Sequence, residues 1–213
     1  MNALAKEIAQ LLLDAKAVKV SMDPPFTWTS GIKSPIYCDN RVMIAFPEAR
    51  KKITKSFQQL IQEQGIEVDY IAGTATAGIP WAAFLAYEME IPMVYVRSEP
   101  KGHGAGKQIE GTLPEGKRVV LIEDLISTGG SSMKAVQVLR NEGKAEVKHL
   151  FSIMNYQLQK GEATFHGQNL QVSSLTNFGD LMQLAQQLGY IQDLSAVLEF
   201  QKNPEEWGNK FLS

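Results

Sequence analysis

Cysteine is almost missing from this chain: Cys38 is the only one among 213 residues. A single thiol excludes an internal disulfide and a zinc site built from cysteines, and it suits a reducing cytosol. No apolar run approaches the roughly 18 residues that a membrane-spanning helix requires. Residues 1–7 contain no basic segment followed by an apolar one, the pattern of a secretory leader. We therefore expect a cytoplasmic protein that does not cross a membrane.

Neither sign of charge dominates the sequence. The 21 Lys and Arg residues nearly balance the 23 Asp and Glu residues, so the net charge is −2 and the pI is near 6.0. Binding of nucleic acid through bulk electrostatics needs a basic surface, so this class of protein is disfavoured. Any site for an anion must be built locally. The length suits one core with an appended subdomain and is short for two full domains.

From residue 68 on, apolar strand-like runs alternate with helical patterns, which indicates an α/β fold with right-handed crossovers. The sequence predicts five strands, at residues 68–72, 92–97, 119–122, 147–154 and, at an edge, 170–175. It predicts helices at residues 3–17, from Pro47 to a stop at Gly65, at 80–90, 132–141 and 178–188, and across 194–211 with a restart at Pro204. We thus expect a five-stranded, mainly parallel sheet flanked by helices.

Short apolar pieces broken by proline and glycine fill residues 18–41. This pattern is typical of small antiparallel strands and turns. We expect a hood subdomain over the sheet, drawn from about residues 1–41 plus C-terminal elements, within a single domain that spans residues 1–213.

The most informative stretch, residues 119–132, reads V-V-L-I-E-D-L-I-S-T-G-G-S-S. Its apolar start fits a strand buried on both faces. Gly129 and Gly130 let the backbone approach a ligand closely, and the free N–H groups at the start of the next helix attract anions. A strand end followed by an ordinary helix cap is the simpler alternative, but Gly-Gly before Ser-Ser exceeds what a cap requires. The stretch therefore predicts a phosphate cradle.

Glu123 and Asp124 at the lip of this cradle would repel a phosphate seated beside them. They make sense if the ligand carries a phosphate at one end and, at the other, vicinal hydroxyls that donate to carboxylates. A ribose 5-phosphate has that shape. A nearby divalent cation would relieve the remaining repulsion.

Residues 100–116 contain Lys101, His103 and Lys107 with five glycines and almost no apolar residue. Such a segment cannot bury itself, so we expect a mobile loop over about residues 98–116. Closing over a substrate, this loop would deliver cations to a leaving group and exclude water. A solvated surface loop is the alternative, although the segment is longer than most connections.

The cradle stretch resembles the phosphoribosyl-pyrophosphate (PRPP) binding motif of the type I phosphoribosyltransferases. Two further stretches, F-T-W-T-S-G-I-K-S-P-I-Y at residues 26–37 and R-S-E-P-K-G-H-G at residues 97–104, are similar to those of the orotate phosphoribosyltransferase family. The resemblance covers most of the chain. It implies the type I phosphoribosyltransferase fold and transfer of ribose 5-phosphate from PRPP to orotate, in pyrimidine (UMP) biosynthesis. It also implies a magnesium cofactor and a homodimer whose loops reach the partner's site, with no nucleic acid or membrane partner.

The same resemblance implies roles for individual residues. Lys101, Glu123 and Asp124 would be catalytic, and Ser127 would contact orotate. His103 would donate a proton or a hydrogen bond. Binding of PRPP is implied for Arg97, Lys101, His103, Glu123, Asp124, Leu125, Ile126, Ser127, Thr128, Gly129, Gly130 and Ser131. The turn at residues 73–78 would be the pyrophosphate loop, and no side chain is given to the metal. By their positions, His149 and His166 are expected to be structural or solvated.

Several positions depart from the family pattern. Lysines are common in the family where this chain has Thr29, Ala77 and Ser98; an aromatic pair is replaced by Tyr37-Cys38; and residues 152–159 contain no arginine. These departures indicate either a distinct subgroup or a weakened activity, and the retained charged residues favour the subgroup. The orotate carboxylate would then be held by Lys33 or by backbone amides of the hood.

Two competing functions follow from the same sequence. A purine or uracil phosphoribosyltransferase would share the cradle and differ in the hood, and a screen of products with different bases separates these enzymes. A regulatory protein that uses the same fold to sense a ligand and bind nucleic acid would need an added basic element, which the sequence does not contain. Salt-dependent binding to nucleic acid would revive that second alternative.

Overall fold

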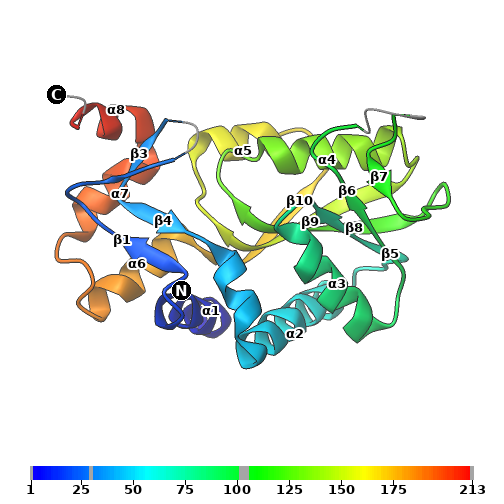
Figure 1. The fold of residues 1–213 in the computed structure, drawn as a ribbon, viewed down its shortest axis with the longest axis horizontal. Coiled ribbons are helices and arrows are strands. Elements are labelled where there is room, and N and C mark those ends of the chain that lie inside the picture. The colour runs from blue at the N-terminus through cyan, green and yellow to red at the C-terminus, as the bar shows by residue number, and fades with distance from the viewer. Residues whose placement is uncertain (1, 29–30, 101–105, 212–213) are drawn as a thin grey trace.

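The computed structural model describes residues 2–28, 31–100 and 106–211 (Figure 1). Its centre is a six-stranded sheet with the strand order β10-β9-β8-β5-β6-β7. The strands are β5 (Tyr70–Thr74), β6 (Met93–Val96), β7 (Ile109–Glu110), β8 (Arg118–Ile126), β9 (Glu146–Asn155) and β10 (Gln171–Asn177). All neighbouring pairs are parallel except β6 with β7. The predicted α/β fold with a mainly parallel sheet is confirmed.

Two details of the predicted sheet are wrong. The sheet has a sixth strand, because β7 forms inside the predicted loop 98–116 and pairs antiparallel with Tyr95 and Val96 of β6. A strand of two residues is too short to show an alternating pattern. In addition, β8 does not end at residue 122 but continues to Ile126, because β9 runs beside it as far as Asn155. The two acids therefore lie inside a strand and not beyond its end.

The helices follow the predicted order. They are α1 (Ala3–Asp14), α2 (Pro47–Glu63), α3 (Gly78–Met89), α4 (Gly130–Asn141), α5 (Gln159–Phe165), α6 (Phe178–Gln187), α7 (Leu194–Lys202) and α8 (Pro204–Asn209), with a 3₁₀ helix η1 (Asn40–Ala45). The restart at Pro204 is confirmed. The sequence did not predict α5, which has only seven residues and little apolar periodicity. Among the described residues, no helix is long and apolar enough to cross a membrane.

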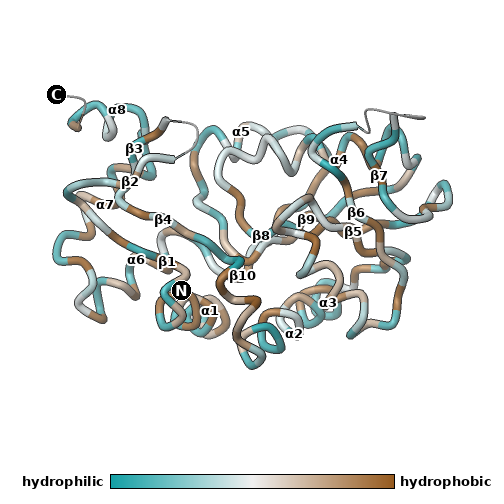
Figure 2. The backbone as a smooth tube through the Cα atoms, viewed as in Figure 1, coloured by the Kyte–Doolittle hydropathy of each residue, from teal (hydrophilic) through white to brown (hydrophobic). Residues whose placement is uncertain are grey.

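The sheet separates two hydrophobic cores. Helices α1, α2 and α3 lie on one side of it, and α4 and α5 lie on the other (Figure 1). Ile122 of β8 is buried in the first core, whereas its neighbour Leu121 is buried in the second, which also contains Leu139 of α4. A strand buried on both faces needs such a continuous apolar run. Figure 2 shows hydrophobic residues gathering on the central strands and hydrophilic residues on the outer turns of α2.

Two small antiparallel pairs of strands stand beside the main sheet. They are β1 (Val18–Val20) with β4 (Ile36–Cys38), and β2 (Phe26–Thr27) with β3 (Lys33–Ser34). We call β1–β4 together with α6–α8 the hood, which lies at the end of the molecule where both chain termini are found (Figure 1). Aromatic contacts of Trp28 join the hood strands to α7 and to the main sheet: its ring centroid lies 5.7 Å from that of Phe200 and 4.8 Å from that of Tyr156, which follows β9. The predicted small antiparallel strands are confirmed.

Candidate active site

Three loops of the chain follow the carboxyl ends of three neighbouring strands of the sheet. β5 lies between β6 and β8, so that Gly73 stands opposite Tyr95 on one side and Ile122 on the other. Because these three strands are parallel, their carboxyl ends lie at the same edge, where open parallel sheets bind ligands. The turn after β5, Arg97 after β6 and the cradle after β8 therefore lie at the same end of the parallel strands.

The cradle consists of the turn at residues 127–129 and the first residues of α4. Gly129 ends the turn with φ of 74°, a left-handed conformation that glycine adopts without steric cost. Within the described part of the chain, no side-chain hydrogen bond caps the helix that starts at Gly130. Since the first four N–H groups of a helix have no partner inside it, this end of α4 is suited to an anion.

The acidic pair is largely buried. Glu123 is 5% exposed, and its carboxylate accepts hydrogen bonds from the Ser132 hydroxyl at 3.2 Å and from the backbone N–H of Asp124 at 3.1 Å. Burial, and after it the charge of Asp124, raises the pKa of Glu123 well above its ordinary value. Burial also raises the pKa of Asp124, opposed by hydrogen bonds from Glu123 and the backbone N–H of Leu125. The pair resists double ionisation, and Asp124 is its more exposed member.

A contact that the sequence did not reveal links η1, directly after the hood strands, to this pair. Asn40, which is fully buried, donates from Nδ2 to the backbone carbonyl of Asp124 at 2.7 Å. Its Oδ1 accepts a hydrogen bond from the Cys38 thiol at 3.2 Å. Burial, and then the charge of Asp124, raises the pKa of Cys38, so this thiol stays neutral. A contact between residues 84 positions apart has no local signal in the sequence.

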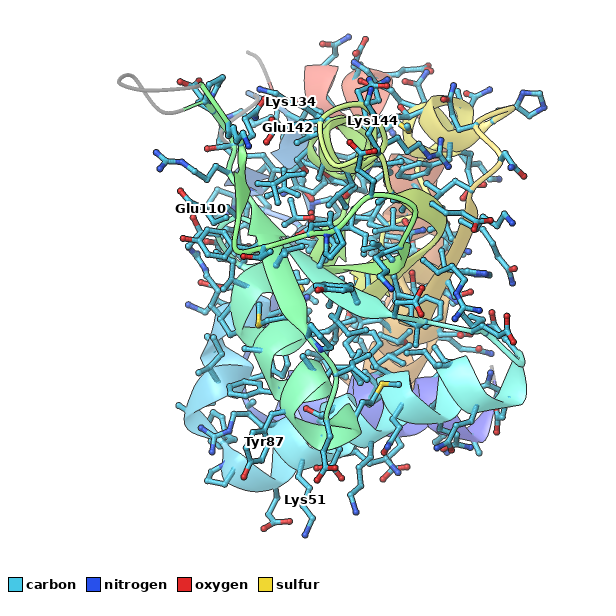
Figure 3. The ribbon with its side chains drawn as sticks, turned by 90° about the vertical axis from the view of Figure 1, so that its right-hand side faces the viewer. Lys51, Tyr87, Glu110, Lys134, Glu142 and Lys144 are labelled. Atoms are coloured by element: carbon cyan, nitrogen blue, oxygen red, sulfur yellow. The ribbon has the colours of Figure 1, made fainter. Side chains whose placement is uncertain are left out.

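Lys134 of α4 and Glu142, which follows α4, hold the start of the predicted loop and the residues that lead into β7. The ammonium of Lys134 donates to the Ser98 carbonyl at 2.7 Å, and the carboxylate of Glu142 accepts from the backbone N–H groups of Gln108 and Ile109 at 3.0–3.2 Å. Lys134 and Glu142 lie at one end of the molecule in Figure 3, and Tyr87 lies at the other.

Arg97 lies beside this fixed stem of the loop. Its guanidinium contacts the Glu110 carboxylate at 3.2 Å, and its backbone N–H donates to the Gln108 carbonyl at 2.9 Å. The arginine side chain is 40% exposed, so its free edge can still reach an anion. Lys101 and His103 lie outside the described residues.

The turn after β5 packs tightly against β8. A Cβ atom at Gly78 would stand 2.5 Å from the carbonyl oxygen of Ile122, so only glycine permits this approach. The backbone N–H of Ala75 donates to the Val96 carbonyl at 2.8 Å, which ties the turn to β6. Ala77 precedes α3 and brings no charge. What this turn presents at the edge of the sheet is mainly backbone.

The hood residues that the sequence pointed to have contacts within the hood. Lys33 donates from Nζ to the Thr27 hydroxyl at 2.9 Å, and Tyr37 is 38% exposed, with its ring 5.9 Å from that of Phe26. Thr29 lies outside the described residues. Of the two histidines given structural or solvated positions, His149 is half-buried in β9, where burial and Lys148 lower its pKa, and His166 is exposed.

Known proteins share both the sequence and the fold. The model of the phosphoribosyl transferase domain matches residues 45–177. An orotate phosphoribosyltransferase of Listeria innocua is 50% identical over 208 residues, which cover 97% of this chain and 99% of the relative. One of Lactococcus lactis is 45% identical and covers 96% and 99%. The chain belongs to the orotate phosphoribosyltransferase family.

Solved structures agree with this family. The orotate phosphoribosyltransferase of Aeropyrum pernix has a TM-score of 0.74 at 29% identity and covers 86% of this chain and 99% of its own. The UMP synthase of Leishmania donovani has a TM-score of 0.79 at 27% identity and covers 94% of this chain and 42% of its own. An adenine phosphoribosyltransferase of Leishmania donovani, with a TM-score of 0.62 at 24% identity, is similar in fold alone.

Proposed function

We propose that this protein is a cytoplasmic orotate phosphoribosyltransferase of pyrimidine biosynthesis. It transfers ribose 5-phosphate from PRPP to orotate, and releases orotidine 5′-phosphate and pyrophosphate. The observation that carries the proposal is the glycine turn before the uncapped start of α4, beside a buried acidic pair, in a chain 50% identical to a relative of that name.

Each part of the candidate site has a role in this reaction. Loss of pyrophosphate builds positive charge on the ribose ring and negative charge on the leaving group. The amides of residues 127–131, with Leu125 and Ile126, hold the 5′-phosphate. Asp124 accepts from the ribose hydroxyls and stabilises the ring cation, with Glu123 held behind it by Ser132.

The cations and the hood complete the site. Arg97, Lys101 and His103 stabilise the departing pyrophosphate, which the turn at residues 73–78 also contacts. Ser127 contacts orotate from the cradle. The hood acts as a subdomain that encloses the base, and Lys33 or hood amides meet its carboxylate.

Magnesium fits the donor set of the site. The described residues contain no cluster of three His, Cys, Asp or Glu side chains that could hold a metal by itself. Magnesium is usually bound by one or two carboxylates together with substrate phosphates and water. Asp124, the more exposed acid of the pair, offers one carboxylate at the ribose end, so the substrate and water would supply the remaining oxygens. Bound there, the ion would neutralise charge on the diphosphate.

The test is the loss of orotate absorbance with PRPP and magnesium, with adenine, guanine and uracil as control bases. We expect turnover with orotate alone. Turnover with another base and none with orotate would support the competing enzymes. Absence of heat from PRPP in calorimetry with saturating magnesium, together with no effect of substituting both acids, would remove the proposal.

We further propose a homodimer in which the loop of each subunit serves the partner's site. Lys101→Ala alone is expected to lower turnover by orders of magnitude with the fold intact, because its charge acts in the transition state. Mixing inactive Lys101→Ala protomers with inactive Asp124→Asn protomers should then restore part of the activity. Absence of recovery in verified heterodimers would mean that each loop serves its own chain.

A further inference from the structure

The short helix α5 packs beside α4 and directly against the cradle turn (Figure 1). The Thr164 hydroxyl donates to the backbone carbonyl of Thr128 at 3.0 Å. Gly161 lies against the preceding residue of the turn, since a Cβ there would stand 2.7 Å from the Ser127 carbonyl oxygen. Two successive carbonyls of the turn therefore face α5.

The third residue of the turn is covered by the ring of Phe165. A Cβ at Gly129 would lie 2.6 Å from this ring. The ring is half-buried, because it also borders a cavity of about 820 Å³ between α5 and β10. The ring also packs against the second core, so it joins that core to the cradle at Gly129.

The direction of these carbonyls decides where the cradle's donors point. A trans peptide is planar, and its C=O and N–H groups point in opposite directions. Holding the carbonyls of Ser127 and Thr128 against α5 therefore turns the N–H groups of Thr128 and Gly129 away from α5. These are two of the amides that would receive the phosphate.

Local structure alone offers a simpler role for the hydroxyl. Thr164 also donates to the Lys160 carbonyl at 2.8 Å, within its own helix, as threonines in helices often do. Its one proton is shared between the two carbonyls, so only the contact with Thr128 connects it to the cradle.

We propose that Thr164 and Phe165 are positioning residues for the 5′-phosphate of PRPP. They act through the backbone of the cradle and do not touch the ligand. The inference rests on the proposed function, because it takes the cradle to be the phosphate site. Part of the affinity for PRPP would then depend on α5, a helix outside the cradle motif.

The experiment measures dissociation constants by calorimetry, with magnesium, for ribose 5-phosphate and for pyrophosphate. Thr164→Val keeps the shape of the side chain and removes the hydroxyl, whereas Thr164→Ser retains a hydroxyl that can donate the hydrogen bond. We expect Thr164→Val to weaken ribose 5-phosphate binding about three- to tenfold, the effect of one hydrogen bond. Thr164→Ser should stay close to wild type, and pyrophosphate binding should not change. The exposed neighbour Glu162→Gln serves as a control that leaves both constants unchanged.

Phe165→Leu gives a second, independent variant, in case Thr164→Val fails to fold. It removes the aromatic ring beside Gly129 and should also weaken the binding of ribose 5-phosphate selectively. Folded variants with wild-type affinity for ribose 5-phosphate, or an equal loss for both ligands, would overturn the inference. Wild-type protein that fails to bind ribose 5-phosphate would instead remove the proposed function.

Discussion

Glu123 is the residue at which folding and the proposed reaction conflict most directly. A buried carboxylate beside a second one destabilises a folded chain unless hydrogen bonds compensate it. Here the compensation comes from one hydroxyl, that of Ser132, and one backbone N–H. The sequence could show that the two acids stand together, but not that one is buried, because burial arises from α4 folding over β8.

Glu123→Gln should therefore stabilise the ligand-free protein at neutral pH. The folded pKa of Glu123 is raised, so its folded state is favoured at low pH and loses stability as the pH rises above the ordinary value near 4.5. The amide removes this loss, and we expect a gain of about 1–2 kcal/mol in the free energy of unfolding at pH 7. Denaturant unfolding at pH 7 and pH 4 measures it, and the gain should vanish at the lower pH. A variant that is less stable at pH 7 would show that Glu123 is ionised and well solvated.

Alanine substitutions at two glycines of the site should have different effects, one on stability and the other on binding of PRPP. Gly78→Ala places a Cβ 2.5 Å from a backbone oxygen of β8, so we expect a loss of about 1–3 kcal/mol in unfolding free energy. Gly130→Ala meets no atom within 4 Å, so stability should not fall, whereas the KM for PRPP should rise because the new methyl group stands at the cradle. Thermal unfolding and steady-state kinetics on both variants separate the two effects. Equal stabilities would contradict the tight contact between the turn and β8.

Among the helices and strands, α4 connects the parts of the site. Its first residues form the cradle, Lys134 holds the carbonyl of Ser98, and Glu142 holds the amides that lead into β7. A glutamate is unfavourable at the C-terminal end of a helix, where the dipole is negative. Its two amide partners offset that cost, which identifies Glu142 as an anchor for the stem of the loop.

Removal of this anchor should loosen β7. Glu142→Ala is expected to speed hydrogen exchange at the Gln108 and Ile109 amides about tenfold, the effect of roughly one hydrogen bond of net stability. Glu142→Gln retains an accepting oxygen and is the matched control, with exchange near that of wild type. Residue-resolved hydrogen exchange gives the exchange rates of these two amides in both variants. Unchanged exchange in the alanine variant would mean that pairing with β6 alone holds the stem.

The longer elements were predictable from the sequence, and the shorter ones were not. Strands such as β9 and helices such as α2 carry enough apolar residues to set a period. β7 and α5 do not, since partners far along the chain hold them: β6 for the one, the cradle turn for the other. The cradle glycines stand in a local turn motif that the sequence shows, whereas Asn40 and Thr164 contact Asp124 and Thr128 only through the fold and gave no such signal.

The molecule as a whole is organised around a hood drawn from both ends of the chain. α8 closes it: Trp207 is 3% exposed, lies 5.6 Å from Phe200 and donates to the Ala196 carbonyl. Gly208 lies against β3, where a Cβ would stand 3.3 Å from Lys33. Strands from the beginning of the chain therefore depend on helices from its end.

Trp207→Ala should lower stability and separate base binding from phosphate binding. Removal of the buried indole is expected to lower the free energy of unfolding by about 3–5 kcal/mol. We expect a higher KM for orotate and an unchanged affinity for ribose 5-phosphate, because the hood and not the cradle is disturbed. Lys210→Ala, which removes only an exposed ion pair with Glu199, is the control. A parallel loss of both affinities would mean that hood and cradle are not separate.

The two-ended hood also has a consequence for synthesis on the ribosome. The sheet strands that carry the cradle emerge as one continuous stretch and can pair in the order in which they are made. Trp28, between β2 and β3, emerges earlier, yet its contact with Phe200 must wait for α7, which is translated near the end. A stalled or shortened polypeptide would therefore expose more of Trp28 near its beginning, a form suited to capture by chaperones.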